Sequence, residues 1–265
     1  MAFPDAPRVI YQHNPLEEVI CQVRFPTILK VDAEAPVAFQ EHIRASYPFY
    51  TTKPTLELPA NVPPELGALL VKQLSPGVGS AAHNFTSRDE KWTLTLTREF
   101  LALTCRAYSR WEDFKNHFAG PLTALHEQYA PGFVTRIGLR YRNVIRRSIL
   151  GLDGVAWNEL LTPWIAGALM SPEVASVAEH SATEIGLSLP DGQGRVRVHH
   201  GMAIDEASKE PCYVIDADFF DERQTELTNA LSRLDFFHGE ARLFFRWCIQ
   251  DRLHAALDPR PVPPG

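Results

Sequence analysis

The first and second halves of the chain repeat the same order of residue types. The spacing between matching segments changes by only a few residues from one match to the next, as short loop insertions would produce. Self-similarity of this kind is typical of a duplicated structural unit. We therefore expect two repeats, residues 1–131 and 132–265, that form one continuous globular unit. The matching pairs are Cys21–Phe25 with Ile137–Tyr141, Val37–Ile43 with Val155–Leu161 and, more weakly, Leu103–Tyr108 with Ile215–Phe220.

Each repeat has the pattern of a strand, a helix, several strands and a second helix. In the first repeat, Val19–Phe25 alternates apolar and polar residues, as a half-buried strand does. Apolar residues at helical spacing follow Pro36, and the alternating runs Trp92–Thr97 and Leu101–Tyr108 predict a strand pair. The second repeat predicts strands at Phe133–Ile145, Ala182–Leu189, Arg195–His199 and Tyr213–Phe219.

Capping signals and apolar periodicity predict three further helices. Strands that follow one another through short turns favour antiparallel pairing, with the helices confined to one face. The sequence therefore predicts an α+β fold in which duplicated units form one curved antiparallel sheet, covered by helices on one side. The first of these helices begins at Ser109, where Glu112 completes a capping box. The second spans Val155–Met170, with a kink at Pro163. The third runs from Asp221, capped with Gln224, to about Leu257.

This order of elements resembles the duplicated saddle of the TATA-binding protein family and related helix-grip folds, although no functional motif of that family is matched. The chain also resembles a sporadically distributed family of bacterial proteins of similar length, to which no catalytic activity is assigned. That patchy distribution implies a setting in bacterial defence or toxin–antitoxin genes. The segments that carry the second resemblance are Asn14–Val19, Phe39–Gln40, Tyr47–Pro48, Trp92–Leu96, Arg136–Asn143 and Tyr213–Phe220.

Composition and charge narrow the classes of function. The chain is 45% hydrophobic and 22% charged, which is typical of a folded globule. Its 26 basic and 32 acidic residues give a formal net charge of −6, which disfavours non-specific binding to nucleic acid. We expect a cytoplasmic protein, since no signal peptide and no membrane-spanning run of about 18 apolar residues is evident. The isolated cysteines are expected to be buried free thiols: Cys21, Cys105, Cys212 and Cys248.

The polar positions of the predicted strands carry an unusual density of charge. If the apolar side chains face the helices, the alternate positions share the opposite face. Three arginines flank Gly138 within one strand, and a strand glycine often marks close approach by another group. No catalytic group, metal site or cofactor motif stands out on this face. The candidate binding residues are Arg24, Arg106, Arg136, Arg140, Arg142, Arg195, Arg197, His199, Asp216 and Asp218.

Two interpretations of this face compete. Arginine forks that accept carboxylates or phosphates would make it a groove for a protein or a small anionic ligand. Alternatively, Asp216 and Asp218 pair with the arginines, and the face is a solvated surface of cross-strand ion pairs. We expect a non-enzymatic binding module, with a homo-oligomer left open. The alternatives are a metal-dependent enzyme on a phosphorylated or nucleotide substrate, with both aspartates as ligands and His199 as acid–base, and nucleic-acid binding by the saddle face.

Two further side-chain groups are interpreted as core. The aromatic stripes Trp111/Phe114/Phe118 and Phe237/Phe244/Trp247 have the spacing of buried helix faces. His238, in the final helix, is more often a satisfied core residue in such company than a catalytic base.

Overall fold

A nine-stranded antiparallel sheet dominates the computed structural model, which describes residues 3–55 and 80–262. Its strand order is β3-β4-β5-β6-β2-β7-β10-β9-β8, and a separate pair joins β1 (Val9–Tyr11) to β11 (Pro259–Pro261). The strands of the large sheet are β2 (Leu16–Arg24), β3 (Phe49–Thr55), β4 (Ser80–Thr86), β5 (Trp92–Leu96), β6 (Phe100–Cys105), β7 (Arg136–Arg146), β8 (Thr183–Ser188), β9 (Arg195–Ile204) and β10 (Pro211–Asp221).

Strands from the two halves of the chain occupy opposite sides of this sheet. They meet where β2 pairs antiparallel with β7, with Cys21 opposite Leu139 and Gln22 opposite Gly138. On each side the strand farther along the chain returns to pair with the central one, β6 with β2 and β10 with β7. This topology is compatible with two copies of one plan, and the duplication itself stays a prediction.

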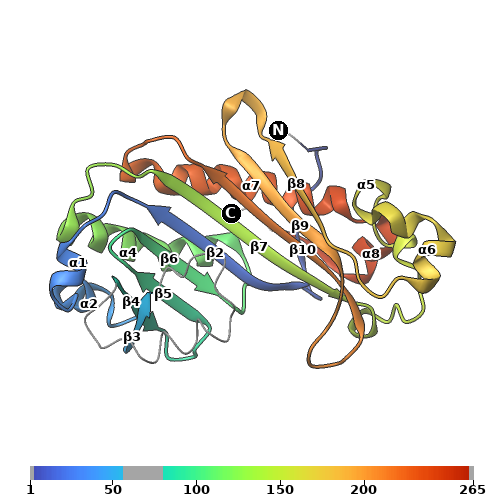
Figure 1. The fold of residues 1–265 in the computed structure, drawn as a ribbon, viewed down its shortest axis with the longest axis horizontal. Coiled ribbons are helices and arrows are strands. Elements are labelled where there is room, and N and C mark those ends of the chain that lie inside the picture. Colours follow the sequence, from blue (N-terminus) through green and yellow to red (C-terminus); the bar gives the residue numbers. More distant parts are fainter. Residues whose placement is uncertain (1–2, 56–79, 263–265) are drawn as a thin grey trace.

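Two long helices cover one face of the sheet (Figure 1). They are α4 (Trp111–Tyr129) and α7 (Ala230–Cys248), and no helix of the described residues lies over the opposite face. Their apolar stripes are buried against the alternate side chains of the central strands, and burying each such aromatic contributes about 2–3 kcal/mol. The shorter helices are α1 (Lys30–Ala33), α2 (Val37–Ile43), α5 (Pro163–Ala166), α6 (Pro172–Val177) and α8 (Asp251–Ala256).

The predicted α+β class with an antiparallel sheet is confirmed, and so is the core role of the aromatic stripes except at Trp247, which is only partly buried. The expected strand pair is β5 and β6, whereas β3 and β4 were missed. The proline-rich passage Pro54–Pro64 lies mostly outside the described residues. No helix among residues 3–55 and 80–262 has both the length and the apolar character needed to cross a membrane.

Two of the three predicted helices form as α4 and α7, but the predictions were wrong in caps, ends or continuity. No capping box forms, because the Ser109 hydroxyl bonds Asp113 and Glu112 pairs with Arg8. Residues 155–170 form short helical turns rather than one helix. Pro163 occupies the first position of α5, where a backbone N–H would have no helical partner, so the proline starts a helix instead of kinking one.

The final helix also differs from the prediction at both ends. Asp221 ends strand β10, where its carboxylate binds Arg223 and Arg233, and α7 begins only at Ala230. The helix stops before Ile249, whose extended backbone bridges to Leu161, and a separate α8 follows. An isolated β-bridge to a distant segment therefore ends the helix at a point where the apolar periodicity of the sequence continues.

Candidate functional site

All ten predicted site residues come from strands of the central sheet or the turns that follow them. Strand alternation and register place them on the face that α4 and α7 leave uncovered. In β7, for example, Ile137, Leu139 and Tyr141 are buried on the helix side, so the arginines between them face the other way. The structure therefore brings the predicted residues onto one surface.

Most of these arginines already have carboxylate partners. Arg136 donates to Asp218 at 2.7 Å, and Arg140 holds Asp216 through two nitrogens, with 2.7 Å between Nε and Oδ1. The bidentate hydrogen bond to Asp216 raises the pKa of Arg140. Because the guanidinium forks are occupied by the protein itself, the centre of this face fits the interpretation as an ion-pair surface better than that of a free anion groove.

The ion pairs of β9, near one edge of this face, are longer than those at its centre. In β9, Arg197 and His199 are more than half exposed and both lie 3.7 Å from Glu184. Arg195 of the same row is exposed. The remaining pairs are Arg24 with Glu99 at 3.9 Å, Arg106 with Glu18 at 3.0 Å, and Arg142 with Glu17.

Gly138 makes room for its own strand rather than for a ligand. A Cβ at this position would lie 2.4 Å from Nη1 of Arg136. That guanidinium folds across the glycine and stacks over the ring of Phe220, 4.8 Å from its centroid. The predicted close approach at Gly138 is therefore real, but the approaching group is the neighbouring arginine.

The pairing also bears on the metal-enzyme alternative. Asp216 and Asp218 have oxygens engaged by Arg140 and Arg136. Within the described parts of the chain, no group of three or more His, Cys, Asp or Glu side chains is placed to hold a metal ion. Nothing in this arrangement supports His199 as an acid–base group beside a metal.

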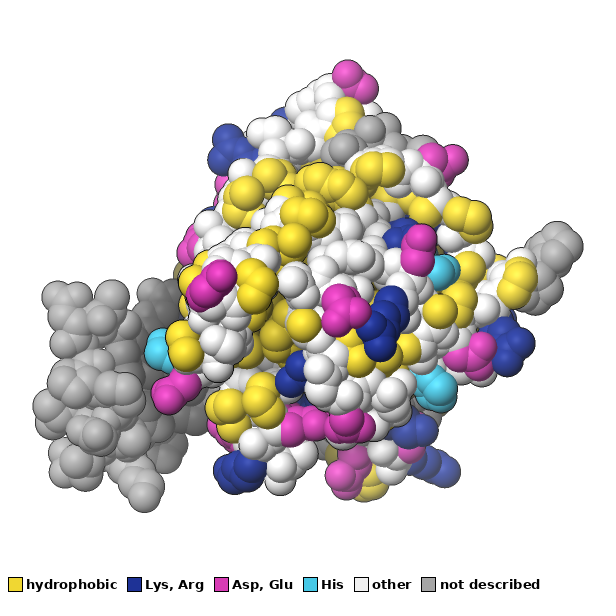
Figure 2. Space-filling view, turned by 90° about the vertical axis from the view of Figure 1, so that its right-hand side faces the viewer, with side chains coloured by type: hydrophobic (Ala, Val, Ile, Leu, Met, Phe, Trp, Pro, Cys, Tyr) yellow, Lys and Arg dark blue, Asp and Glu magenta, His cyan; other side chains and the backbone are white. Residues whose placement is uncertain are grey.

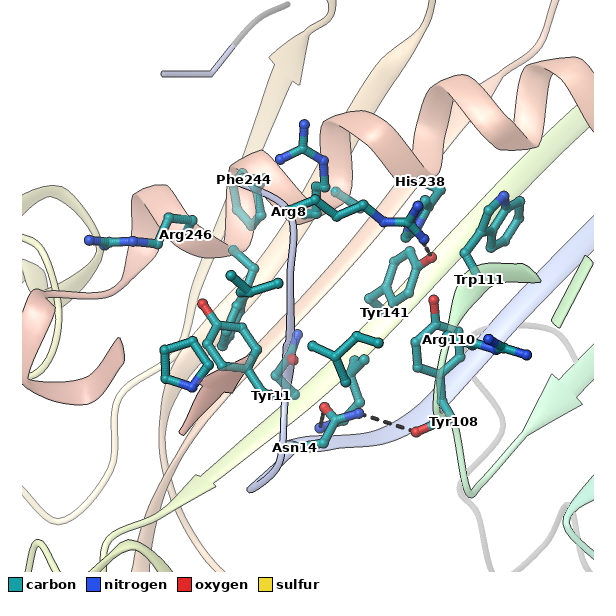
Figure 3. Close-up of a pocket in the computed structure, with 18 of the residues that line it drawn as sticks. Arg8, Tyr11, Asn14, Tyr108, Arg110, Trp111, Tyr141, His238, Phe244 and Arg246 are labelled. Atoms are coloured by element: carbon teal, nitrogen blue, oxygen red, sulfur yellow. Dashed lines mark hydrogen bonds between the residues drawn. The ribbon is translucent and has the colours of Figure 1, made fainter. Parts of the chain in front are cut away.

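A well-defined pocket lies on the other side of the sheet. A cavity of about 280 Å³ opens between the helix-facing surface of β7 and β10 and the side of α7 (Figure 3). Its floor includes Tyr141 and Phe219, and Phe244 and Phe245 of α7 form one wall. The N-terminal segment Ala6–Leu16 and the turn Tyr108–Trp111 close the other sides.

The N-terminal wall is tied to the body by a few specific contacts. β1 pairs with β11 over three residues, and Arg242 donates to the backbone carbonyl of Ala6 at 2.7 Å. The side-chain amide of Asn14 donates to the carbonyl of Tyr108 at 3.2 Å, and the Tyr11 hydroxyl meets Nδ1 of His254 at 2.8 Å. The pocket therefore exists only because both ends of the chain fold back onto α7.

A connected set of aromatic and polar groups forms one end of the pocket. The hydroxyl of Tyr141 lies 2.9 Å from Nδ1 of His238, and the Tyr141 ring meets the Tyr108 ring edge to face, with centroids 5.9 Å apart. The His238 ring stacks on Trp111 with centroids 4.8 Å apart, and its Nε2 is buried without a hydrogen-bond partner among the described residues. The guanidinium of Arg8 extends over this group (Figure 3).

The histidine and the two tyrosines at this end are neutral at ordinary pH. Burial, reinforced by the positive charge of Arg8, lowers the pKa of His238 to about 4. Burial also raises the pKa of Tyr108 and Tyr141 above the usual value for tyrosine, so both keep their protons. The charged groups that act on His238 are Arg8 with its partner Glu112, 2.6 Å away, and, more weakly, Arg242 and Asp235.

Sequence reasoning missed this pocket. It interpreted Trp111 and His238 as core, which is correct for the stacked rings but leaves out the unpartnered nitrogen. The lining comes from segments that are distant in the chain, and each is unremarkable by itself. Asn14 enters the sequence analysis only within Asn14–Val19, one of the segments that resemble the sporadic bacterial family.

An apolar patch lies on the surface at the end of the molecule that carries α5, α6 and α8. Figure 2 shows apolar side chains gathered there between isolated charges. Exposed apolar residues from this part of the chain include Ile149, Met170, Val174 and Val177. Apolar surface of this kind suits contact with another macromolecule.

Comparison with known proteins adds no family to this picture. A scan against protein-family models found no match, and a search of curated proteins found none either. The resemblances to a saddle fold and to a sporadic bacterial family therefore stay predictions.

Proposed function

We propose that this protein is a non-enzymatic binding module that holds a small molecule in the pocket between the sheet and α7. The observation that carries the proposal is the cavity itself, about 280 Å³ of space with mostly apolar walls and a few convergent polar groups. Ligand sites in proteins have this character, whereas well-packed cores leave few voids larger than a water molecule. We place the protein in the cytoplasm, because its four buried free cysteines suit a reducing compartment.

The size of the pocket limits the ligand. At about 30 Å³ per water molecule in the liquid, the space corresponds to about nine waters, or a ligand on the order of ten non-hydrogen atoms. The flat walls offered by Tyr11, Phe244 and Phe245 suit an aromatic or branched aliphatic body.

Binding fits the pocket better than catalysis does. A general base works best when its pKa lies near the operating pH, and His238 titrates far below that range. Its Nδ1 is engaged by Tyr141, and the serine among the lining residues, Ser109, bonds Asp113 instead of a histidine. The arrangement thus offers donors and apolar surface without an activated nucleophile.

The experiment uses the neutral probe 4-phenylbutan-1-ol, followed by saturation-transfer NMR and calorimetry. Saturable binding is expected for the natural chain and is lost in Ala241→Phe, which fills the pocket from α7. The matched variant Ala207→Phe, at an exposed hairpin position, keeps binding. Absence of saturable binding, or equal binding by Ala241→Phe and the natural chain, rejects the proposal.

A second candidate function uses the uncovered sheet face to hold an acidic protein. The exposed row Arg195, Arg197 and His199 supports it, because only long, weak ion pairs engage these side chains. Poly-L-glutamate is the probe, and the double variant Arg195→Ala/Arg197→Ala should bind it less tightly at low salt. Equal binding by both proteins eliminates this candidate.

A further inference from the structure

We infer that the pocket takes a small amphipathic anion, a carboxylate or comparable acid on an aromatic or branched aliphatic body, and that Arg8 binds its charged group. This inference rests on the proposed function and adds the chemical class of the ligand. The argument comes from the charges that line the pocket, from their existing partners and from the walls around them.

The lining is basic although the chain is acidic. Four arginines line the pocket, and no aspartate or glutamate is among its lining residues in the described structure. The whole chain has 26 basic and 32 acidic residues, so the sign of this local charge is opposite to that of the protein. Because carboxylates just outside the lining pair with Arg8, Arg110 and Arg246, the preference for an anion comes from unoccupied guanidinium donors rather than from net charge.

Three of the four arginines are committed to structural contacts. Arg110 donates to Asp113 at 3.0 Å, and Arg242 donates to the Ala6 carbonyl. Arg246 donates to the Ile249 carbonyl at 2.8 Å and also binds a nearby aspartate. In Figure 3, Arg110 and Arg246 point away from the middle of the pocket toward opposite ends.

Arg8 also has a carboxylate partner, but it differs from Arg110 and Arg246 in its direction (Figure 3). Its guanidinium extends along α7 over Tyr141 and His238, and among the described residues only Nη2 is engaged, by Glu112 at 2.6 Å. The other nitrogens of the fork remain available as donors in a planar arrangement that matches a carboxylate. The Arg8 side chain is 39% exposed, so a charged group held there stays near the mouth.

The neutral groups around Arg8 support the same orientation. The hydroxyls of Tyr108 and Tyr141 keep their protons, and His238 carries no charge at ordinary pH, so this end presents dipoles without a competing cation. The opposite side, with Leu16 and Phe245, offers apolar surface for the body of the ligand. An anionic group at one end and an apolar body at the other therefore matches both parts of the pocket.

Substitution of Glu112 provides a second, independent test of the inference. Its carboxylate occupies part of the Arg8 fork, so it competes with an incoming anion for the same donor. Removing the charge with Glu112→Gln should strengthen binding of an anion, whereas Arg8→Gln should weaken it. A purely structural role for the pair would make both variants behave alike.

The test compares three probes of equal shape by calorimetry: 4-phenylbutyrate, 4-phenylbutan-1-ol and 4-phenylbutylamine. We expect the acid to bind most tightly and the amine most weakly. Arg8→Gln should weaken the acid about tenfold and leave the alcohol unchanged, because a hydrogen bond to a charged group is worth at least that factor. Glu112→Gln should tighten the acid, and the control Arg44→Gln, at an exposed arginine that pairs with Glu41 outside the pocket, should change neither probe.

The outcomes separate the two proposals. If the alcohol binds at the pocket but the acid binds no more tightly, or if Arg8→Gln leaves the acid unaffected, the ligand class is wrong and the binding function stands. If neither probe binds, the proposed function fails as well. Since Arg8 and Glu112 form an exposed pair worth little stability, thermal melting should confirm that all variants are folded.

Discussion

Protonation of His238 should make the protein markedly less stable in mild acid. Burial and the nearby Arg8 charge lower the pKa of His238 to about 4 in the folded protein, against 6.5 for an ordinary histidine. Between these values the unfolded chain binds a proton that the folded chain does not, so lowering the pH through this window favours unfolding. Each pH unit of difference is worth about 1.4 kcal/mol, which gives about 3 kcal/mol in full.

Urea denaturation at pH about 7.5 and about 4.5 measures the effect, because most of the loss is complete at the lower value. Other histidines with lowered pKa, such as His83 and His200, contribute equally to the natural chain and to a His238 variant. The comparison with His238→Gln therefore isolates one residue. The natural chain should lose about 2.5 kcal/mol more than His238→Gln between the two pH values.

The control is His180→Gln, which changes an exposed histidine and should keep the pH dependence of the natural chain. If the natural chain and His238→Gln lose the same free energy of unfolding on acidification, His238 is well hydrated. The reasoning that makes this end of the pocket dry and free of a histidine cation would then be refuted.

Two further predictions concern the sheet. Arg140→Ala should lower the free energy of unfolding by about 1–3 kcal/mol, because it leaves the nearly buried carboxylate of Asp216 without its bidentate partner. Arg197→Ala, which breaks a loose exposed pair, should cost less than about 0.5 kcal/mol, and equal losses by urea denaturation would contradict this ranking. Gly201→Ala should be severely destabilising by thermal melting, since its Cβ would lie 1.9 Å from a backbone oxygen. Gly186→Ala, whose Cβ meets nothing within 4 Å, should retain most of its stability, and equal melting of the two variants would show that the backbone gives way at Gly201.

The central strands β2, β7, β10 and β9 could be predicted because their cause is local, whereas β3 and β4 at one edge of the sheet were missed. Residues 136–146 alternate sides with a period of two, so the apolar members define the buried face and the arginines between them must share the other. The same reasoning placed Asp216 and Asp218 opposite those arginines and foresaw their pairing as one of two interpretations. Helix ends were less predictable, since the break at Ile249 depends on a bridge to Leu161 from a distant segment.

The sequence alone determined which side chains alternate along each strand, which helix stripes are apolar and how charge is distributed, because periodicity and composition are properties of neighbouring residues. Tertiary structure alone decided where a hollow remains. The pocket is enclosed by β1, the turn before α4, two strands and α7, and its character comes from Arg8, Tyr141 and His238 meeting across long separations in the chain. A cavity is space that packing leaves unfilled, so its position depends on how these elements come together, and no local pattern of residues encodes it.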